Sequence, residues 1–441
     1  MPERSSARSA IALVTDDFTE LPHPARQTKP DGPLAWDGYD VLRARAADRT
    51  GEDESVVCGT ARIEGTPAVL IAFEFGFLGG SLGERTGDRL EAAHTHAREH
   101  RLPVVALIAT GGSRMQEGMV ALTQLQGVAR QSALTREAGL PQLAVLRDPT
   151  TGGGWATLGA GADVILALPG AQVGFAGSRV RPADADPAAY TAEAQVAAGA
   201  ADAVVRPEEL RPTLGRWLGL LGAPSTEPAP APRPLGATDL PASGWAAVQR
   251  ARSPQRPRAH HYLDAYFAHR VAISGDRCGG TDDGVLCGFG AHQGRTVAYA
   301  AQTGAATRPA GYRTAARLIR LADRLGIPVL TLVDTPGAAN DAEAERQGVG
   351  AAIADLFDAV ASARTPITSL VIGEGGSGGA LALAAPGNTW ASPDSYFSVI
   401  APELAAAILK RPPQEVESTA DQLRIRPQDL AELGIARTDV R

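Results

Sequence analysis

The two halves of this 441-residue sequence contain the same series of apolar runs and glycine loops, in the same order. In each half, a continuous apolar run of strand length ends at a glycine loop, a helix-length stretch follows, and a second apolar run ends at a second loop. The loops lie at 111–112 and 152–154 in the first half, and at 336–337 and 375–379 in the second. Strands that alternate with helices predict βαβ units and a largely parallel sheet. The repeat therefore predicts an α/β fold with two tandem copies of one domain.

The spacing between the loops also favours duplication. Gly152 follows Gly111 by 41 residues, and Gly375 follows Gly337 by 38. Any two α/β domains share some features, but a matched order together with a matched spacing is better explained by two copies of one fold. The helices expected between the loops cover 115–137 and 343–363.

A proline-rich segment separates the halves. Residues 223–243 contain six prolines and few large apolar residues. Proline lacks the N–H that helices and sheets use, so the segment predicts a stiff, extended linker. The expected domains are 1–222 and 244–441, joined by this linker.

Charge and cysteine content exclude several classes of protein. The 42 basic and 49 acidic residues give a net charge of −7, which argues against nucleic acid or an anionic membrane as a partner. Cys58, Cys278 and Cys287 are too far apart for a four-cysteine zinc site or a disulfide framework, so we expect reduced thiols. Residues 1–12 lack the apolar core of a signal peptide, and no run of 18 apolar residues occurs. We therefore expect a soluble, cytoplasmic protein.

Glycine pairs between a buried strand and a helix serve two physical purposes. They allow a turn with positive φ, and they leave backbone N–H groups uncovered where the helix dipole favours negative charge. Two such loops can aim two N–H donors at one oxygen, which makes an oxyanion hole. Tight turns without a ligand are the alternative for any single loop. Four loops in a repeated order favour two oxyanion holes.

Side chains for other chemistries are missing around the loops. Ser377 is flanked by two glycines on each side, where we expect a flexible loop rather than the strained nucleophile elbow of a G-x-S-x-G motif. Residues 373–378 match G-x-G-x-x-G, but no strand ends in an acidic residue about 20 positions later, so a dinucleotide site is not expected. His96 and His100 have charged neighbours and indicate a solvated helix face, so no metal is expected. The remaining chemistry is stabilisation of an enolate-like oxyanion, with the base supplied by the substrate or an external cofactor.

Long motifs in both halves match one enzyme family. The first half contains FEFGFLGGSLGERTGDRL, ATGGSRMQEGMVALTQL, RDPTTGGGWA and VGFAGSRV. The second half contains GDR at 275–277, GYRTAARLIRLADRLGIPVLTLVDTPGA, AEAERQGVGAAIADL, VIGEGGSGGALAL and YFSVIAPELAAAILK. The first set resembles the β subunit of the carboxyltransferase of bacterial acetyl-CoA carboxylase, and the second resembles its α subunit. The resemblance covers 32–220 and 256–440.

This resemblance implies two tandem crotonase (ClpP-like) β-β-α superhelix domains, with a β-like domain at 1–222 that has no zinc ribbon and an α-like domain at 244–441. It implies transfer of a carboxyl group from carboxybiotin, on a separate biotin carboxyl carrier protein, to an acyl-CoA. Acetyl-CoA is the simplest acceptor, giving malonyl-CoA for fatty acid biosynthesis, and biotin carboxylase would be a further partner. In the family the active site lies between a β-type and an α-type domain, usually across a dimer interface, which implies a homodimer.

The resemblance also implies roles by position. In the first half, Gly111, Gly112 and Ser113 with Gly152 and Gly153 would hold the thioester oxyanion of the enolate. In the second half, Gly337 with Gly375 and Gly376 would bind the ureido oxygen of biotin. Arg114, Arg179, Arg313 and Arg346 are candidates for the CoA phosphates or for domain pairing, and we assign Arg114 and Arg179 to CoA. Surface ion pairs are the alternative for each arginine.

Departures from the family pattern leave the substrate open. The four cysteines of a zinc ribbon are absent, Ser113 stands where the family has alanine, and Trp155 follows the second loop where the family often has GGV. Residues 302–313 stand where the family has a longer, lysine-containing loop. Trp155 is bulky enough to reshape an acyl or CoA pocket. A biotin-independent malonyl-thioester decarboxylase and a non-catalytic scaffold are therefore kept as alternatives.

Overall fold

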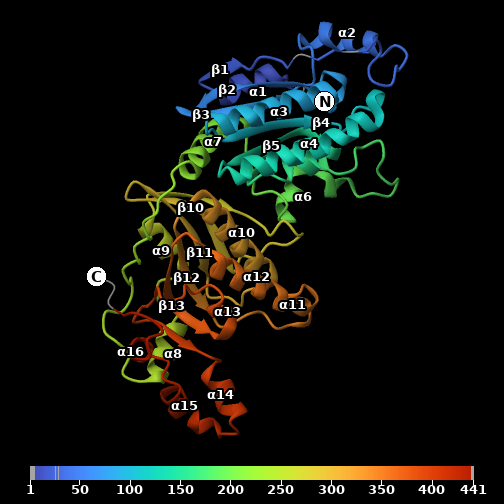
Figure 1. Ribbon diagram of the computed structural model, residues 1–441. Coiled ribbons are helices and arrows are strands. Elements are labelled where there is room, and N and C mark those ends of the chain that lie inside the picture. The colour runs from blue at the N-terminus through green and yellow to red at the C-terminus, as the bar shows by residue number, and fades with distance from the viewer. Residues whose placement is uncertain (1–4, 25, 28, 439–441) are drawn as a thin grey trace. The chain divides into compact units, whose positions relative to one another are not determined.

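The computed structural model of the chain describes residues 5–24, 26–27 and 29–438. They fall into two compact units, Met1–Gly222 and Ala223–Arg441, which we call unit 1 and unit 2. Figure 1 shows a sheet with helices packed against it in each unit.

The proline-rich segment 223–243 is irregular and belongs to unit 2. Thr368 Oγ1 donates a hydrogen bond to Ala229 O at 2.7 Å, and Ser225 N donates to Gly326 O at 2.8 Å. The segment therefore runs along unit 2, held by specific hydrogen bonds.

Unit 1 is built on one mixed sheet with the strand order β1-β2-β3-β4-β5-β6-β8, and β7 pairs with the end of β5. The pairs β1·β2 and β2·β3 are antiparallel, and every later pair is parallel. The strands are β1 (Asp17–Glu20), β2 (Val56–Ile63), β3 (Thr66–Phe73), β4 (Val104–Thr110), β5 (Gln142–Thr151), β6 (Val164–Ala167), β7 (Val173–Gly174) and β8 (Ala203–Val204). The helices are α1 (Ala7–Val14), α2 (Tyr39–Thr50), α3 (Glu84–Glu99), α4 (Gly118–Glu137), α5 (Gly152–Gly154), α6 (Ala192–Ala197) and α7 (Pro207–Leu221).

Unit 2 is built on a sheet with the order β14-β13-β12-β11-β10-β9, and β15 pairs with the end of β13. Its antiparallel part is β9 to β11, and its parallel part runs from β11 to β14. The strands are β9 (His269–Ile273), β10 (Val285–His292), β11 (Arg295–Gln302), β12 (Val329–Thr335), β13 (Ile367–Gly376), β14 (Thr389–Ala391) and β15 (Tyr396–Ser398). The helices are α8 (Gly244–Arg252), α9 (Ala259–Tyr266), α10 (Pro309–Leu325), α11 (Ala342–Arg346), α12 (Val349–Ser362), α13 (Ser377–Leu381), α14 (Pro402–Ile408), α15 (Val416–Gln422) and α16 (Pro427–Glu432).

Helices bury both faces of the central strands. In unit 1, α3 and α4 pack against each other, while α1 and α7 form a second pair that lies against β3. Val69 and Ile71 of β3 share a core with α3, and Leu70, which points to the other face, is also fully buried. In unit 2, α10 pairs with α12 and lies against β10 and β11. Burial on both faces is what the continuous apolar runs of parallel strands predict.

Local sequence signals place most of these elements. β4 and β12 are buried at every position. Helix α10 begins with Pro309 and ends before Gly326, which takes φ +66°, the usual start and stop signals of a helix. The helix expected at 115–137 forms as a 3₁₀ turn followed by α4. The helix expected at 343–363 is divided into α11 and α12, because Gly348 takes φ +76° between them.

The strand register relates the two units residue by residue. Each unit contains one pair of strand-end residues and one isolated bridge that match those of the other unit. The pairs are Thr110 with Thr150 and Leu82 with Ser113 in unit 1, and Thr335 with Gly375 and Thr307 with Ala338 in unit 2. Every unit 2 residue in this set lies 225 positions after its counterpart (335 − 110 = 225). Residues 82–154 and 307–379 therefore correspond without insertion, and the predicted tandem α/β fold is confirmed.

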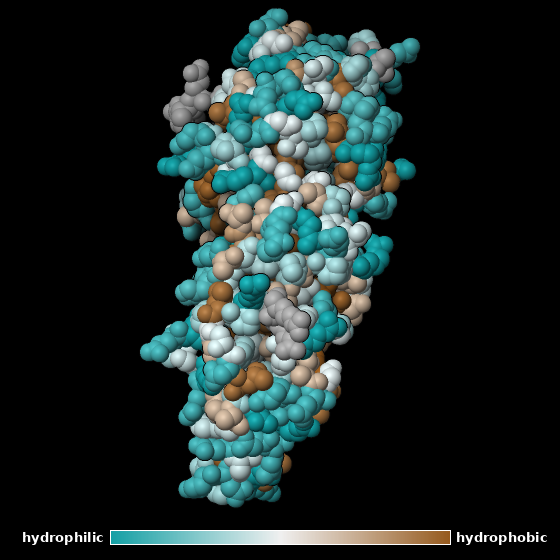
Figure 2. All heavy atoms as spheres, turned by 90° about the vertical axis from the view of Figure 1, so that its left-hand side faces the viewer, coloured by the Kyte–Doolittle hydropathy of each residue, from teal (hydrophilic) through white to brown (hydrophobic). Residues whose placement is uncertain are grey.

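The surface is mainly polar. Figure 2 shows a face on which hydrophilic residues predominate and hydrophobic residues are scattered singly or in small groups. Scattered apolar residues are ordinary on a protein surface. Within the described ranges, no helix is both long and apolar enough to cross a bilayer.

Candidate active site

The two glycine loops of unit 1 leave neighbouring strands at the same end of the sheet. β4 and β5 pair regularly up to Ile108 opposite Leu146, and the register then shifts by a bulge in β5 so that Thr110 faces Thr150. Beyond this point Gly112 takes φ +109° and Gly152 takes φ +66°. A Cβ on Gly152 would lie 2.9 Å from Gly112 Cα. Both backbone conformation and close contact therefore require glycine where the loops meet.

Most loop amides of unit 1 are used by internal hydrogen bonds. Gly111 N donates to Gly79 O at 2.9 Å, Gly112 N to Thr110 Oγ1 at 3.1 Å, and Gly152 N to Phe175 O at 3.1 Å. These three residues were predicted to belong to the loops that hold the thioester oxyanion, and their own N–H groups are already paired. Among the described residues, Ser113 N and Gly153 N donate to no protein acceptor. These two N–H groups are therefore among those that the loops leave available.

Unit 2 repeats the same scheme at the counterpart positions. Gly337 N donates to Thr335 Oγ1 at 3.2 Å, just as Gly112 N donates to Thr110 Oγ1. Gly337 was predicted to belong to the loops that bind the ureido oxygen, and its own N–H is paired within the loop. The N–H groups of Ala338 and Gly378, the counterparts of Ser113 and Gly153, likewise donate to no protein acceptor among the described residues.

The second loop of unit 2 begins two residues later than predicted. Gly375 and Gly376 were expected in the loop, but they are the last residues of β13 and pair with Phe397 and Ser398 of β15. They remain essential to packing, because a Cβ on Gly376 would collide with the Pro336 carbonyl. The residues missed by sequence reasoning are Ala338 and Gly378. Aligning Thr110 with Thr335 in the sequence would have identified them, because counterpart residues of the two units are 225 positions apart.

Ser377 has the backbone of an elbow rather than that of a flexible loop. It joins β13 to α13 with φ +58°, where its counterpart Gly152 has φ +66°. The prediction of a flexible loop was therefore wrong. No hydrogen bond among the described residues links its hydroxyl to a histidine or carboxylate, the partner that would activate a serine as a nucleophile. The strand–turn–helix geometry is present without a catalytic triad.

Arg114 is not available to CoA, contrary to prediction. Its side chain is 1% exposed and is paired with Glu54, which is fully buried. Its Nη1 also donates to Glu54 Oε2 at 3.1 Å and to Tyr39 Oη at 3.2 Å, and Tyr39 Oη donates to Glu117 Oε1 at 2.6 Å. Burial alone would raise the pKa of Glu54, but the Arg114 charge and hydrogen bonds hold this pKa below its usual value. Arg114 therefore anchors the loop from inside the unit.

The other candidate arginines differ in their surroundings. Arg179 is exposed, and no ion pair of the described residues includes it, so its assignment to CoA stays a prediction. Arg313 is paired with buried Asp276 at 2.7 Å, and Arg346 with Glu343 at 3.0 Å on the surface. These two side chains are engaged within unit 2.

The Trp155 side chain is packed in the core of unit 1. It is 8% exposed and belongs to the main core of unit 1, where its ring lies against Gly159 and the described core residues around Leu146. It begins a short π-helical turn, Trp155–Gly159, directly after α5. The reshaping of an acyl or CoA pocket by this ring stays a prediction.

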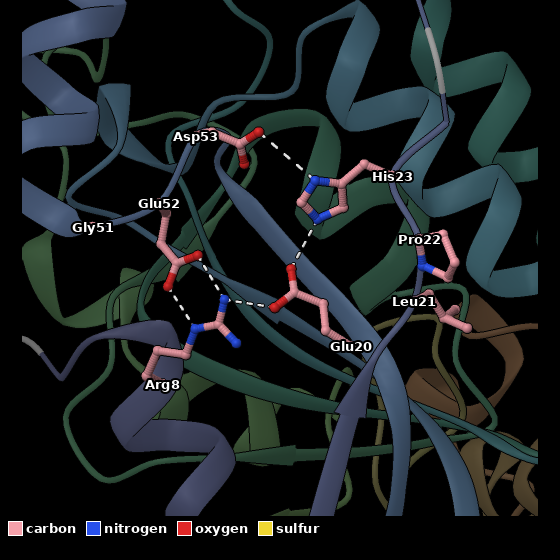
Figure 3. Close-up of a pocket in the computed structure, with 8 residues that line it drawn as sticks. All are labelled: Arg8, Glu20, Leu21, Pro22, His23, Gly51, Glu52 and Asp53. Carbon is pink, nitrogen blue, oxygen red and sulfur yellow. Dashed lines mark hydrogen bonds and ion pairs between the residues drawn. The ribbon is translucent and has the colours of Figure 1, made fainter.

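A pocket of about 480 Å³ lies elsewhere on unit 1, among the residues drawn in Figure 3. Arg8 pairs with Glu52 and Glu20 at 2.7 Å, and His23 bridges Glu20 at 2.8 Å and Asp53 at 3.7 Å. The charged groups that line it are thus paired with one another. None of the predicted site residues lines this pocket.

Cysteines and metal ligands contribute nothing to the loops. Burial raises the pKa of both Cys58 and Cys287 to about 12, so these thiols stay neutral. Cys278 is exposed, and all three cysteines are free. Within the described residues, no group of three or more His, Cys, Asp or Glu side chains is placed to hold a metal ion.

Two tandem units of one α/β architecture, each with paired glycine loops, define a crotonase-like fold. The crystal structure of transcarboxylase 12S with methylmalonyl-CoA bound has this fold, with a TM-score of 0.81 and 21% identity over 99% of this chain and 87% of that one. A single-chain, multi-domain long-chain acyl-CoA carboxylase also has it, with a TM-score of 0.75 over 99% of this chain and 46% of that one. At such identities the likeness shows the fold alone.

Sequence comparison identifies the family. Residues 35–215 match the carboxyl transferase domain family, and 240–440 match the acetyl co-enzyme A carboxylase carboxyltransferase-like family. The acetyl-coenzyme A carboxylase carboxyl transferase subunits beta/alpha of Saccharopolyspora erythraea are 40% identical over 90% of this chain and 73% of their own length. Those of Salinispora arenicola are 38% identical over 98% and 81%. A probable biotin-dependent acyl-coenzyme A carboxylase beta3 subunit of Mycobacterium tuberculosis is 36% identical over 92% and 83%.

The chain belongs to the acetyl-CoA carboxylase carboxyltransferase family, with the β-type and α-type domains fused. It is a biotin-dependent acyl-CoA carboxyltransferase, as the sequence motifs predicted.

Proposed function

We propose that this chain transfers a carboxyl group from carboxybiotin, held on a separate carrier protein, to acetyl-CoA, giving malonyl-CoA. The observation that carries the proposal is the repeated pair of backbone N–H groups without protein acceptors: Ser113 and Gly153 in unit 1, Ala338 and Gly378 in unit 2. Acetyl-CoA is chosen as the acceptor because the fused relatives at 38–40% identity carry the acetyl-CoA carboxylase name.

In unit 1, Ser113 N and Gly153 N hold the thioester oxygen of the acyl-CoA. Negative charge develops on this oxygen when a proton leaves the α-carbon, so donors fixed in advance lower the barrier. The fixation comes from the internal bonds of Gly112 and Gly152. Arg179, exposed on the same unit, contacts the CoA phosphates in this proposal.

In unit 2, Ala338 N and Gly378 N hold the ureido oxygen of biotin. Bound biotin supplies the carboxyl group and, after losing it, the base that takes the α-proton. The site fits such a planar group, because a Cβ placed on Gly378 would meet nothing within 4 Å. Ala338 N stays near the protein surface, since its residue is only partly buried. No side chain of the chain is needed as a nucleophile.

Partners follow from this chemistry. A biotin carboxyl carrier protein must deliver the biotin, and a biotin carboxylase must carboxylate it. We include a homodimer in the proposal, because the family resemblance implies an active site formed by a β-type and an α-type domain across a dimer interface. These partners and this assembly are separate from the carboxyltransferase activity and need their own tests.

The first test is release of acetyl-CoA from malonyl-CoA by the purified chain, with and without biocytin. We expect release that depends on biocytin, because the reverse transfer needs an acceptor for the carboxyl group. Release without biocytin would favour the biotin-independent decarboxylase instead. No release, despite measurable binding of malonyl-CoA, would favour a scaffold. Propionyl-CoA and methylmalonyl-CoA in the same assay decide the acyl specificity.

A further inference from the structure

The β12·β13 pair of unit 2 contains a bulge directly before both loops. The strands pair regularly up to Val333 opposite Val371, and the next pair is Thr335 opposite Gly375. β13 therefore has three residues, 372–374, where β12 has only Asp334. Such a bulge leaves backbone groups without their ladder partners, and buried backbone groups need partners.

Two buried side chains supply the missing partners. Asp334 is fully buried, and its Oδ1 accepts a hydrogen bond from Glu374 N at 3.2 Å. Arg256, whose side chain is 2% exposed, donates from Nη2 to the same Oδ1 at 2.6 Å and from Nη1 to Ile372 O at 3.3 Å. The ion pair thus bonds to one N–H and one C=O of the bulge.

The surrounding residues are shaped for this ion pair. A Cβ on Gly373 would collide with the Arg256 guanidinium and with Asp334 Oδ1. Arg258 Nη1 adds a second bond to Asp334, to Oδ2 at 3.3 Å. The backbone of Asp334 is held as well, because its carbonyl accepts from Gly304 N at 2.8 Å.

We propose that Asp334, with Arg256 as its counter-charge, is a positioning residue that fixes the two donor loops of unit 2 relative to each other. Asp334 directly precedes Thr335, whose hydroxyl holds Gly337 N, and Glu374 directly precedes the strand end that leads to Gly378. The carboxylate therefore joins the two strands just before their last ladder pair, Thr335 opposite Gly375, from which the two chains lead to Ala338 and Gly378. β12, β13 and α13 can be followed in Figure 1.

This inference rests on the proposed function to explain why a displaced loop would lower activity. Whether Asp334 holds the loops in place can be measured without turnover, by hydrogen exchange. In Asp334→Asn, the shape is kept while the charge that holds Arg256 is lost. We expect faster hydrogen exchange in residues 335–339 and 374–379 and unchanged exchange in residues 110–114 and 151–155 of unit 1. Unchanged exchange in unit 2 overturns the inference whether or not the wild-type chain is active.

Kinetics test the consequence. For biocytin-dependent release of acetyl-CoA, we expect kcat of Asp334→Asn to fall at least tenfold with KM for malonyl-CoA within about twofold, because malonyl-CoA is assigned to unit 1. Faster exchange with wild-type kcat also overturns the positioning role. A wild-type chain without biocytin-dependent activity refutes the proposed function instead. The hydrogen-exchange result still decides whether Asp334 fixes the two loops.

Two further variants guard against a merely structural effect. Gly373→Ala displaces the ion pair without removing a charge, and we expect the same exchange and kcat pattern as for Asp334→Asn. Asp355→Asn breaks the exposed pair between Arg320 and Asp355, 2.6 Å apart on α10 and α12, and we expect no change in either readout. If Asp334→Asn fails to fold, Gly373→Ala alone decides the matter: wild-type exchange and kcat in that variant overturn the inference.

Discussion

The two units share a backbone but stabilise it with different buried charges. In unit 1 the cation is Arg114, one residue beyond the donor Ser113, and its partner is Glu54. In unit 2 the anion is Asp334, before the loop, and its partner is Arg256. Neither charge occurs at the counterpart position, since Arg114 corresponds to Ala339 and Asp334 to Ala109.

The bulges before the loops show the same contrast. In unit 1, Thr150 Oγ1 donates to Ile108 O at 2.8 Å, and Pro149 has no N–H that would need a partner. In unit 2, the counterpart residues are Gly375 and Glu374, and an ion pair provides the bonds. Hydrogen bonds within the backbone and from threonine hydroxyls are therefore common to both units, while the charged interior is specific to each. A role assigned to a side chain in one unit cannot be transferred to the other by position.

The largest effect we expect comes from breaking the buried ion pair of unit 1. Glu54→Gln keeps the shape but leaves buried Arg114 with Glu117, at 3.5 Å, as its remaining carboxylate among the described residues. Removing one partner of a buried pair costs about 3–5 kcal/mol, so thermal unfolding of unit 1 should shift strongly. Hydrogen exchange in β2 to β5 localises the loss. Glu209→Gln, in the exposed pair with Arg206, is the control and should change nothing measurable. Equal unfolding temperatures for both variants would contradict the assignment.

The next effect tests whether the N–H or the side chain of the donor residue acts. Ser113→Pro deletes the N–H, whereas Ser113→Ala makes the loop like that of unit 2, where Ala338 stands. We expect Ser113→Pro to lower kcat/KM for malonyl-CoA by roughly 10²–10³-fold, the effect of losing one oxyanion donor, and Ser113→Ala to retain activity. Circular dichroism of the two variants checks that both fold. A large loss in Ser113→Ala with little loss in Ser113→Pro would refute backbone donation.

Sequence reasoning reached the fold but did not show which loop N–H groups are left without a protein acceptor. Apolar runs and glycine loops predict strands and turns, because these depend on local chemistry, and the expected doubling is confirmed by the register. Which amide is free depends on tertiary hydrogen bonds, such as that from Gly111 N to Gly79 O, which no local pattern reveals. The burial of Arg114 depends on Glu54, 60 positions away. Long-range pairing of this kind limits what a single sequence can specify.

The helices α3 and α10 also differ at one buried position, and this difference should make the stability of unit 1 depend on pH. His94 on α3 is fully buried with no partner for Nε2 among the described residues, and its counterpart 225 positions later is buried Ile319. Burial, with a smaller contribution from Arg98, lowers the pKa of His94 to about 4 from 6.5. The unfolded chain therefore binds a proton more readily, and stability falls as pH drops from about 6.5 to 4.

The matching variant is His94→Ile, which copies unit 2. It should flatten the acid dependence of unit 1 by on the order of 1 kcal/mol for each pH unit in that window. Thermal unfolding followed between pH 7 and about pH 4.5, a range chosen to cover most of the titration, measures the difference in slope. His100→Gln, on the exposed end of the same helix, serves as the control. The pH explanation is excluded if the slopes of wild type and His94→Ile coincide.

The smallest expected effect concerns the elbow where the units differ by one side chain. Ser377 and its counterpart Gly152 both take the left-handed conformation, with φ +58° and +66°. The left-handed conformation destabilises a non-glycine residue by roughly 1 kcal/mol. Replacing that residue with glycine removes this strain, but the greater freedom of glycine in the unfolded chain offsets part of the stabilisation. Ser377→Gly should therefore stabilise unit 2 by no more than about 1 kcal/mol. The reciprocal change, Gly152→Ser, should destabilise unit 1 by more, because its Cβ would lie 2.9 Å from Gly112 Cα. Unfolding temperatures that change in opposite directions in the two variants would establish that the two elbows share a backbone conformation and differ in how closely the first loop approaches each of them. Equal decreases in unfolding temperature would mean that the Ser377 side chain stabilises unit 2 by its own contacts.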